Sequence, residues 1–247
     1  MKYLPLLLLP IVFTLGNVHA QSPPPESNFI RYMTDPADPL VRGSGEPETE
    51  VRNMESPLHE IVVGNGMQLF ILAGDGNTIK VAAQKEVLPL VLSETKDHTL
   101  TVRLSASLET AKGIRLYVPA GRISKITVKE GAYLYLPNGV QIDDLKLQVE
   151  SGSVADCAFA SGNFSCTTMG GSTLHLSGKA TREAKIVVLG GSVLEAKKFE
   201  CARCKITVLG ASDAKIRVSE ALNARVENES RLVYYGTPKE KTITTAL

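Results

Sequence analysis

Three copies of one phrase decide the fold of this chain: SCTTMGGSTLHLS from Ser165, KIVVLGGSVLEAK from Lys185 and KITVLGASDAKIR from Lys205. The small-residue step inside each copy belongs to a series that returns every 18 to 21 residues. Its members are Gly131-Ala132, Gly152-Ser153, Gly171-Ser172, Gly191-Ser192, Ala211-Ser212 and Glu229-Ser230. A short, fixed period indicates that each copy is one structural unit stacked on the next.

When the copies are aligned on their Ser, alternate positions are apolar or small in every copy. Before the Ser these columns are Leu147, Cys166, Ile186 and Ile206, then Val149, Thr168, Val188 and Val208; after it they are Ala155, Leu174, Leu194 and Ala214, then Cys157, Leu176, Ala196 and Ile216. Alternation within a copy and likeness between copies predict parallel rungs about 4.8 Å apart with inward side chains stacked in ladders. We therefore predict an all-β fold, a parallel β-helix (β-solenoid) with rungs of about 20 residues. A β-sandwich with accidental internal similarity is the alternative.

Residues 1–20 have the features of an export signal. Lys2 supplies the positive region, Leu6–Leu15 the apolar core, and a small-residue cleavage site ends at Ala20. A retained N-terminal anchor is the alternative, but the apolar core is short for a bilayer span. We expect an exported protein, periplasmic or extracellular, with no transmembrane segment after signal removal.

Residues 21–57 hold seven of the thirteen prolines of the chain. Polar, Pro-rich sequence buries too little apolar surface to offset its ordering entropy, which predicts a flexible leader. The apolar residues around Phe29 could nevertheless dock on the domain. Residues 58–247 consist of short alternating segments bounded by Gly, Asn and Pro, which predict one β-helix domain.

The charge balance excludes some classes of partner. Loss of the signal removes Lys2 and no acid, so 27 basic and 26 acidic residues become 26 and 26. A neutral chain has no overall electrostatic attraction for nucleic acid. Trp is absent and aromatic residues make up 5% of the chain. Aromatic sugar-binding subsites are therefore expected to be scarce, and we predict no nucleic-acid partner.

The four cysteines are Cys157, Cys166, Cys201 and Cys204. Cys201 and Cys204 form a Cys-x-x-Cys motif that leads into a predicted strand, whereas a redox motif needs a helix there, and a zinc site needs further ligands nearby. Export favours disulfides. Cys166 and Cys204 lie two rungs apart, beyond the reach of a bridge. We therefore predict the pairs Cys157–Cys166 and Cys201–Cys204.

Four phrases occur in an order that resembles the head GIN domain family of putative auto-transporter adhesins. They are GNGMQLFILAGDGNTIKVAA from Gly64, a D-x-x-L-x-V phrase from Asp97, the LGGS and LGAS steps, and SEALNARVENESRLVYYGTPK from Ser219. The resemblance covers Leu58 to Lys239 and implies a right-handed parallel β-helix, export, an adhesin-like role and no established catalytic residues. Glu229 and the four cysteines depart from the family pattern.

One outward column can be built three positions after the Ser: Asp156, His175, Glu195 and Lys215. It could be a ligand-binding or acid/base stripe, or a solvated face whose opposite charges relieve repulsion. Polysaccharide-cleaving β-helices need clustered carboxylates, and here His175 separates the two acids. No serine or cysteine nucleophile system is recognisable. We assign no catalytic, metal or cofactor-binding residue and keep the column as a candidate surface ladder.

We therefore predict a non-enzymatic binding or adhesion module of the bacterial cell envelope or exterior. Its ligand would be a surface glycan or a protein. The first alternative is a self-assembling envelope protein that packs end to end or by its faces, as a homo-oligomer. The second is a polysaccharide-acting hydrolase or lyase, which a carboxylate cluster in a concave groove would favour. A flat face of Thr, Ser, Lys and small residues would favour binding.

Overall fold

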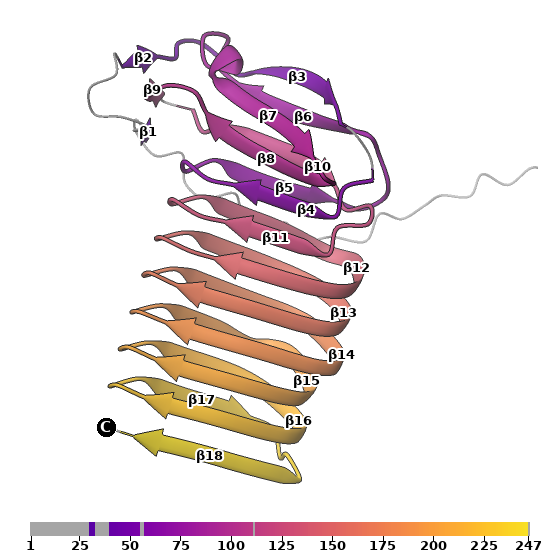
Figure 1. The fold of residues 1–247 in the computed structure, drawn as a ribbon, viewed down its shortest axis with the longest axis vertical. Coiled ribbons are helices and arrows are strands. Elements are labelled where there is room, and N and C mark those ends of the chain that lie inside the picture. Colours follow the sequence, from indigo (N-terminus) through magenta and orange to yellow (C-terminus); the bar gives the residue numbers. More distant parts are fainter. Residues whose placement is uncertain (1–29, 33–39, 55–56, 111, 247) are drawn as a thin grey trace, which may run out of the picture.

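The structure, a computed structural model, describes residues 30–32, 40–54, 57–110 and 112–246; the predicted export signal lies outside them. These residues are nearly all β, with one short 3-10 turn, η1 (Leu88–Leu90), and the strands form a tall stack (Figure 1). The strands are β1 (Ile30–Tyr32), β2 (Val41–Arg42), β3 (Glu48–Asn53), β4 (Glu60–Val63), β5 (Gln68–Leu72), β6 (Thr78–Ala83), β7 (Val91–Lys96), β8 (Thr99–Leu104), β9 (Leu108–Thr110), β10 (Arg115–Pro119), β11 (Lys125–Val128), β12 (Tyr133–Val149), β13 (Val154–Met169), β14 (Thr173–Leu189), β15 (Val193–Leu209), β16 (Asp213–Glu227), β17 (Arg231–Tyr235) and β18 (Glu240–Ala246).

Strands β12 to β16 are the rungs of the stack. Each is 15 to 17 residues long, bends near its middle and returns along the opposite side (Figure 1). Successive rungs pair in parallel along both halves, and the register shifts near the bend. We call the sheet built from the first halves sheet 1 and the sheet built from the second halves sheet 2. The predicted β-solenoid is confirmed.

The predicted inward columns are confirmed by the backbone pairing. One column in sheet 2 is Leu147–Cys166–Ile186–Ile206, and one in sheet 1 is Ala155–Leu174–Leu194–Ala214. All of these side chains are buried. Burial of a large aliphatic side chain contributes about 1.5–3 kcal/mol, so the ladders are the main source of stability.

The small-residue step is a corner with two consecutive residues of positive φ. At Gly190 and Gly191 the φ angles are 63° and 71°. Two such residues in a row are typical of a type I′ turn, which glycine enters without steric cost. Asn228 and Glu229 adopt the same geometry, with φ of 55° and 59°. Glu229 departs from the small residue of the family pattern, but the backbone of the corner has the same geometry.

The serine of each step ties its corner to the neighbouring one. The backbone N–H of Ser153 donates to Ser172 Oγ at 3.2 Å, and the N–H of Ser172 donates to Ser192 Oγ at 3.2 Å. Ser192 and Ser212 continue the series at 3.2 Å and 3.1 Å, ending on Ser230. The first four of these serines are buried. Ser recurs because its hydroxyl satisfies a backbone donor that water does not reach.

Three phenylalanines fill the interior near the bends of β13 and β15. The ring centroids of Phe159, Phe164 and Phe199 lie 5.1 to 5.5 Å apart, and all three are buried. In β14, the rung between β13 and β15, the residue paired with Phe164 is the small Ala184. The rings therefore pack together across a rung of smaller side chains.

The strands before β12 extend both sheets in a different order. Sheet 1 continues from β12 through β5, β10, β6 and β3, and sheet 2 continues through β11, β4, β8 and β7. The pairs β10–β6, β3–β6 and β7–β8 are antiparallel. Segments far apart in sequence, such as β5 and β10, thereby become neighbours.

Part of the predicted leader is folded. β1 and β2 both pair with β9, and β3 pairs with β6 along its whole length. The folded strands therefore begin before Leu58. β3 alternates charged residues rather than apolar ones, so its sequence gives no sign of a buried strand. Residues 21–29 and 33–39 lie outside the described residues.

The two predicted disulfides are not formed. All four cysteines are free and buried. Cys157 lies in sheet 1 and Cys166 in sheet 2, so they face each other across the core, and packed sheets are about 10 Å apart, beyond the roughly 7 Å limit between Cα atoms. Cys201 and Cys204 are close enough for a hydrogen bond between their side chains, which together with burial raises the pKa of Cys204, and both are free cysteines.

Candidate functional site

The predicted surface ladder is assembled on the outer face of sheet 1. The backbone pairs Asp156 with His175, His175 with Glu195, and Glu195 with Lys215. The side chains therefore follow one another at about 4.8 Å along the stack. The structure thus brings all four predicted residues into one column.

The upper half of the ladder is a hydrogen-bonded chain. The Tyr133 hydroxyl donates to Asp156 Oδ2 at 2.6 Å, and His175 Nδ1 lies 2.5 Å from Asp156 Oδ1. The hydrogen bond with His175 lowers the pKa of Asp156, and the same contact raises the pKa of His175. Burial and the hydrogen bond to Asp156 raise the pKa of Tyr133. Asp156 is thereby held as a carboxylate between two donors.

The lower half of the ladder is an ion pair. Lys215 Nζ lies 2.7 Å from Glu195 Oε1, and this hydrogen bond raises the pKa of Lys215. In the next column, Arg231 and Asp213 form another pair at 2.9 Å. The charges on this part of sheet 1 are therefore matched with each other.

This arrangement lacks the parts of a glycoside hydrolase. A general acid needs a carboxyl group with a raised pKa, whereas the pKa of Asp156 is lowered. The second acid, Glu195, is occupied by Lys215. In the described part of the chain, no group of three or more His, Cys, Asp and Glu side chains could hold a metal ion.

Sequence reasoning missed an aromatic extension of the same column. Asp156 pairs with Tyr135, Tyr135 with Phe70, and Phe70 with Tyr117. The ring centroids of Phe70 and Tyr117 lie 5.2 Å apart, and those of Phe70 and Tyr135 lie 6.0 Å apart. The few aromatic residues of the chain therefore include three that gather in one outward column. A signal was present, because QLFIL, RLYVP and YLYLP share a Leu–aromatic–aliphatic pattern.

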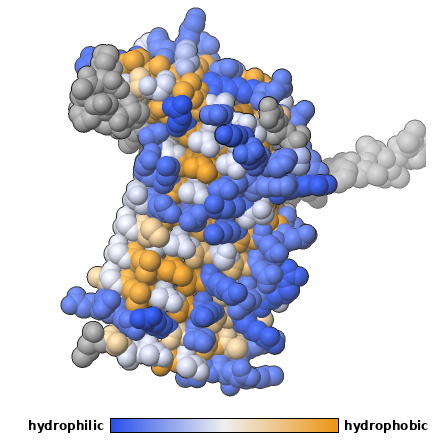
Figure 2. Space-filling view, in the orientation of Figure 1, coloured by the Kyte–Doolittle hydropathy of each residue, from blue (hydrophilic) through white to orange (hydrophobic). Residues whose placement is uncertain are grey.

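The outer face of sheet 2 has a different chemistry. One column there is Lys125–Lys146–Ser165–Lys185–Lys205, the next is Thr127–Gln148–Thr167–Val187–Thr207, and the third, beside the corners, is Met169–Leu189–Leu209. Figure 2 shows a hydrophobic patch over the rungs of this face, with hydrophilic residues beside it. The three columns together form a flat strip that is cationic on one side and apolar on the other.

Several polar groups of this strip have no partner in the described residues. Lys125 pairs with Glu60 at 2.6 Å and Lys185 with Glu183 at 3.2 Å. No ion pair or side-chain hydrogen bond forms within the described chain at Lys146, Thr167, Lys205 or Thr207. These groups remain free to bind a ligand.

A cavity of about 410 Å³ opens on the same strip. Its lining includes Lys146, Ser165 and Lys185, and also the acids Asp144 and Glu183. The hydrogen bond from the Asn163 side chain lowers the pKa of Asp144, and the guanidinium of Arg182, 2.9 Å from Asp144 Oδ1, lowers it further. Asp144 is paired with Arg182 and Glu183 with Lys185, so Lys146 is the lysine of this lining that has no ion-pair partner in the described residues.

The family of the chain follows from its sequence. The model of the family described as putative auto-transporter adhesin, head GIN domain, matches residues 57–238. The chain belongs to this family. The match spans the strands from β4 to β17, so both sheets of the solenoid are part of the head GIN domain.

Solved structures have the same fold as this head GIN domain. A putative adhesin from Bacteroides fragilis has a TM-score of 0.76 at 17% identity, over 83% of this chain and 95% of that one. A putative adhesin from Parabacteroides distasonis has a TM-score of 0.65 at 17% identity, over 84% and 98%. A protein from the same organism described as a putative lipid binding protein has a TM-score of 0.63 at 13% identity, over 84% and 97%. At these identities the likeness shows the fold alone.

No curated protein matches the chain. Within the described residues, no helix is long and apolar enough to cross a membrane.

Proposed function

We propose that this head GIN domain protein is a non-enzymatic, exported adhesion module of the bacterial cell envelope or exterior, and that it binds an acidic glycan along the outer face of sheet 2. The observation that carries the proposal is the strip of unpartnered Lys and Thr side chains beside the apolar column. The description of the family as adhesins agrees with a binding role.

The chemistry of the strip suits a sugar chain. Thr167 and Thr207 offer hydroxyl groups to sugar hydroxyls, and the Met169–Leu189–Leu209 column offers an apolar surface to sugar C–H groups. Lys146 and Lys205 are three rungs apart, or about 14 Å, and would meet acidic groups spaced along the ligand. An extended ligand would therefore follow the axis of the stack.

The outer face of sheet 1 is the weaker candidate. Its carboxylates already have partners in Tyr133, His175 and Lys215. Matched charges on a solvated face contribute little and attract no charged ligand. The same matching argues against acid/base chemistry at Asp156 and Glu195.

The test is a panel of acidic and neutral polysaccharides with the purified protein, with release of soluble product followed in the same wells. We expect saturable binding of acidic chains that weakens with salt, and no product. Lys205→Glu should weaken binding at least about tenfold, about 1.4 kcal/mol. Lys198→Glu is the matched control, because Lys198 is an exposed lysine on the first half of the same strand, β15.

Three outcomes would overturn the proposal. Product release that disappears in Glu195→Gln would show an enzyme. Equal loss of binding in Lys198→Glu and Lys205→Glu would place the ligand off the strip. Absence of binding to every chain in the panel would exclude a glycan ligand and favour a protein partner.

A further inference from the structure

Two outermost strands of the stack, β3 and β18, place polar or charged residues at inward positions. In β3, Glu50 pairs with Val81 and Arg52 with Ile79, and both partners are buried. Paired residues on neighbouring strands point to the same side of a sheet. Glu50 and Arg52 therefore lie at inward positions, as does Glu48, which pairs with buried Ala83.

The other end of the stack shows the same departure. In β18, Lys241 pairs with Leu222 and Thr245 with Val226, both of which are buried. Ile243, at the inward position between them, is 41% exposed because no described strand covers it. Of the described strands, β3 pairs only with β6, and β17 and β18 pair only with β16. Polar inward residues thus occur where a sheet has an open edge.

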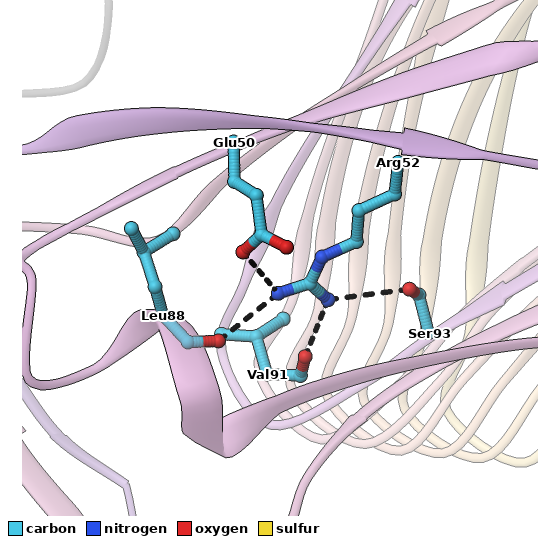
Figure 3. A network of polar contacts seen from close by, with 5 residues as sticks. All are labelled: Glu50, Arg52, Leu88, Val91 and Ser93. Carbon is cyan, nitrogen blue, oxygen red and sulfur yellow. Dashed lines mark hydrogen bonds and ion pairs between the residues drawn. The ribbon is translucent and has the colours of Figure 1, made fainter.

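At the upper end, Arg52 spans the two sheets. It extends from β3 in sheet 1 to η1 and β7, which lead into sheet 2 (Figure 3). Its guanidinium donates to the carbonyl oxygens of Val91 at 2.5 Å and Leu88 at 3.0 Å, and to Ser93 Oγ at 3.2 Å. Glu50 holds the same guanidinium at 2.9 Å.

At the lower end, Lys241 makes the equivalent contact, but it extends from β18 in sheet 2 to β17 in sheet 1. Its Nζ donates to the Tyr234 hydroxyl at 3.0 Å and lies 5.4 Å from the centre of the Tyr234 ring. Tyr234 pairs with buried Ile216, so it is the inward residue of sheet 1 on the last rung. At each end of the stack, a cationic side chain of one sheet therefore contacts polar atoms of the other sheet, across the open end of the apolar interior.

We propose that these two contacts cap the solenoid against end-to-end association with a second copy of the chain. An open end of a β-solenoid offers unpaired backbone groups and an uncovered apolar interior, which another copy could extend. Stacking a second copy here would enclose the exposed carboxylates of Glu48 and Glu50 at the upper end, or the ammonium group of Lys241 at the lower end, without water. Burial without water is unfavourable for a charge that lacks a full set of partners. The protein therefore presents its faces as a single stack. This inference is independent of the ligand proposed above.

The test changes the inward residues of the lower end and measures mass by sedimentation velocity over a wide concentration range. The wild-type protein should remain a monomer. Lys241→Leu combined with Thr245→Val should give a species of twice the mass as concentration rises, because two like ends form a closed pair. The further changes Glu48→Val, Glu50→Val and Arg52→Met remove every charge from the inward positions of β3, open the upper end as well, and should give longer chains.

The matched control changes outward residues of the same strand. Thr242→Leu combined with Thr244→Val adds similar apolar surface to β18, but these positions pair with the exposed Asn223 and Arg225. This control should stay monomeric. Circular dichroism identifies any variant that does not fold, and the single change Lys241→Met then replaces the pair.

Two results would overturn the proposal. One is a folded Lys241 variant that stays monomeric at every concentration. The other is wild-type protein, or the outward control, that associates as strongly as the inward variant.

Discussion

The lower part of the solenoid, β12 to β16, and the upper part, β3 to β11, build the same two sheets in different ways. In the lower part each rung is one long strand, and successive rungs pair in parallel. In the upper part each sheet is assembled from short strands in a non-sequential order, with three antiparallel pairs. Apart from the outermost strands, both parts keep apolar residues at inward positions. The comparison teaches that the two packed sheets require apolar residues at every second position of each strand, whereas they do not require a repeated sequence.

The corners of the two parts differ in the same way. Below, Ser172 and its equivalents satisfy the backbone donors of the corner above. Above, Ala132 occupies the Ser position and supplies no hydroxyl. There the side chain of Glu130 accepts hydrogen bonds from the backbone N–H of Asn65 at 3.1 Å and from its amide at 2.9 Å. The corners therefore have the same geometry in both parts. In the lower part they are stabilised by the repeated serine hydrogen bonds, and in the upper part by the contact between Glu130 and Asn65.

The largest expected difference between the parts concerns two phenylalanines. Phe199→Ala in the lower part removes a fully buried ring from the Phe cluster and should lower the free energy of unfolding by about 3–5 kcal/mol. Phe70→Ala in the upper part removes a partly exposed outward ring and should cost about 1 kcal/mol. Urea unfolding measures both. Equal losses would mean that the outward aromatic column is part of the core.

The next effect concerns the cap of the upper part. Arg52→Met should lower the free energy of unfolding by about 2 kcal/mol, because the carbonyl groups of Leu88 and Val91 lose a charged donor. Arg103→Met is the control, since Arg103 is an exposed residue of β8, and should change stability by about 0.5 kcal/mol or less. If Arg52→Met does not change the free energy of unfolding, the contact between the two sheets does not contribute to stability.

A smaller effect is expected at the corners of the lower part. Ser172→Ala should cost about 1–2 kcal/mol, because it leaves the buried backbone N–H of Ser153 without an acceptor. Ser165→Ala, at an outward position of β13, is the matched control and should be nearly neutral. Chemical denaturation compares the two. If both variants match the wild type, the serine ladder is not a source of stability.

The smallest effect is the pH dependence of the surface ladder. The pKa of His175 is raised in the folded state, so its contribution is complete below its unfolded value near 6.5 and is lost as pH rises through the folded value. The pKa of Asp156 is lowered, so its contribution is present above about 3.9 and is lost as pH falls through the folded value. The pair should therefore stabilise most between about pH 4 and 6.5, by about 1 kcal/mol or less because His175 is exposed.

The measurement is the melting temperature of the wild type and of His175→Gln from pH 3.5 to pH 8. The difference between the two should be largest inside this window and should shrink on both sides. A difference that does not change with pH would contradict the ion pair.

The candidate ladder was predictable because it belongs to the repeat. A fixed offset from Ser153, Ser172, Ser192 and Ser212 gives Asp156, His175, Glu195 and Lys215, and parallel stacking preserves that offset. The aromatic extension was not predictable in this way, because Phe70 and Tyr117 lie on strands joined by pairing that the sequence order does not reveal. The disulfide prediction was wrong for a related reason. The repeat shows which residues point inward, but it does not show on which of the two sheets each cysteine lies.

The sequence by itself determined the β-solenoid, its inward columns, its corners and its family, because a stacked repeat depends only on neighbouring copies and its period can be read directly. Only the tertiary structure decided the order of the upper strands, the aromatic column, the free cysteines and the capped ends. These features depend on contacts between residues far apart in the chain, and on where the bend of each rung divides it between the two sheets.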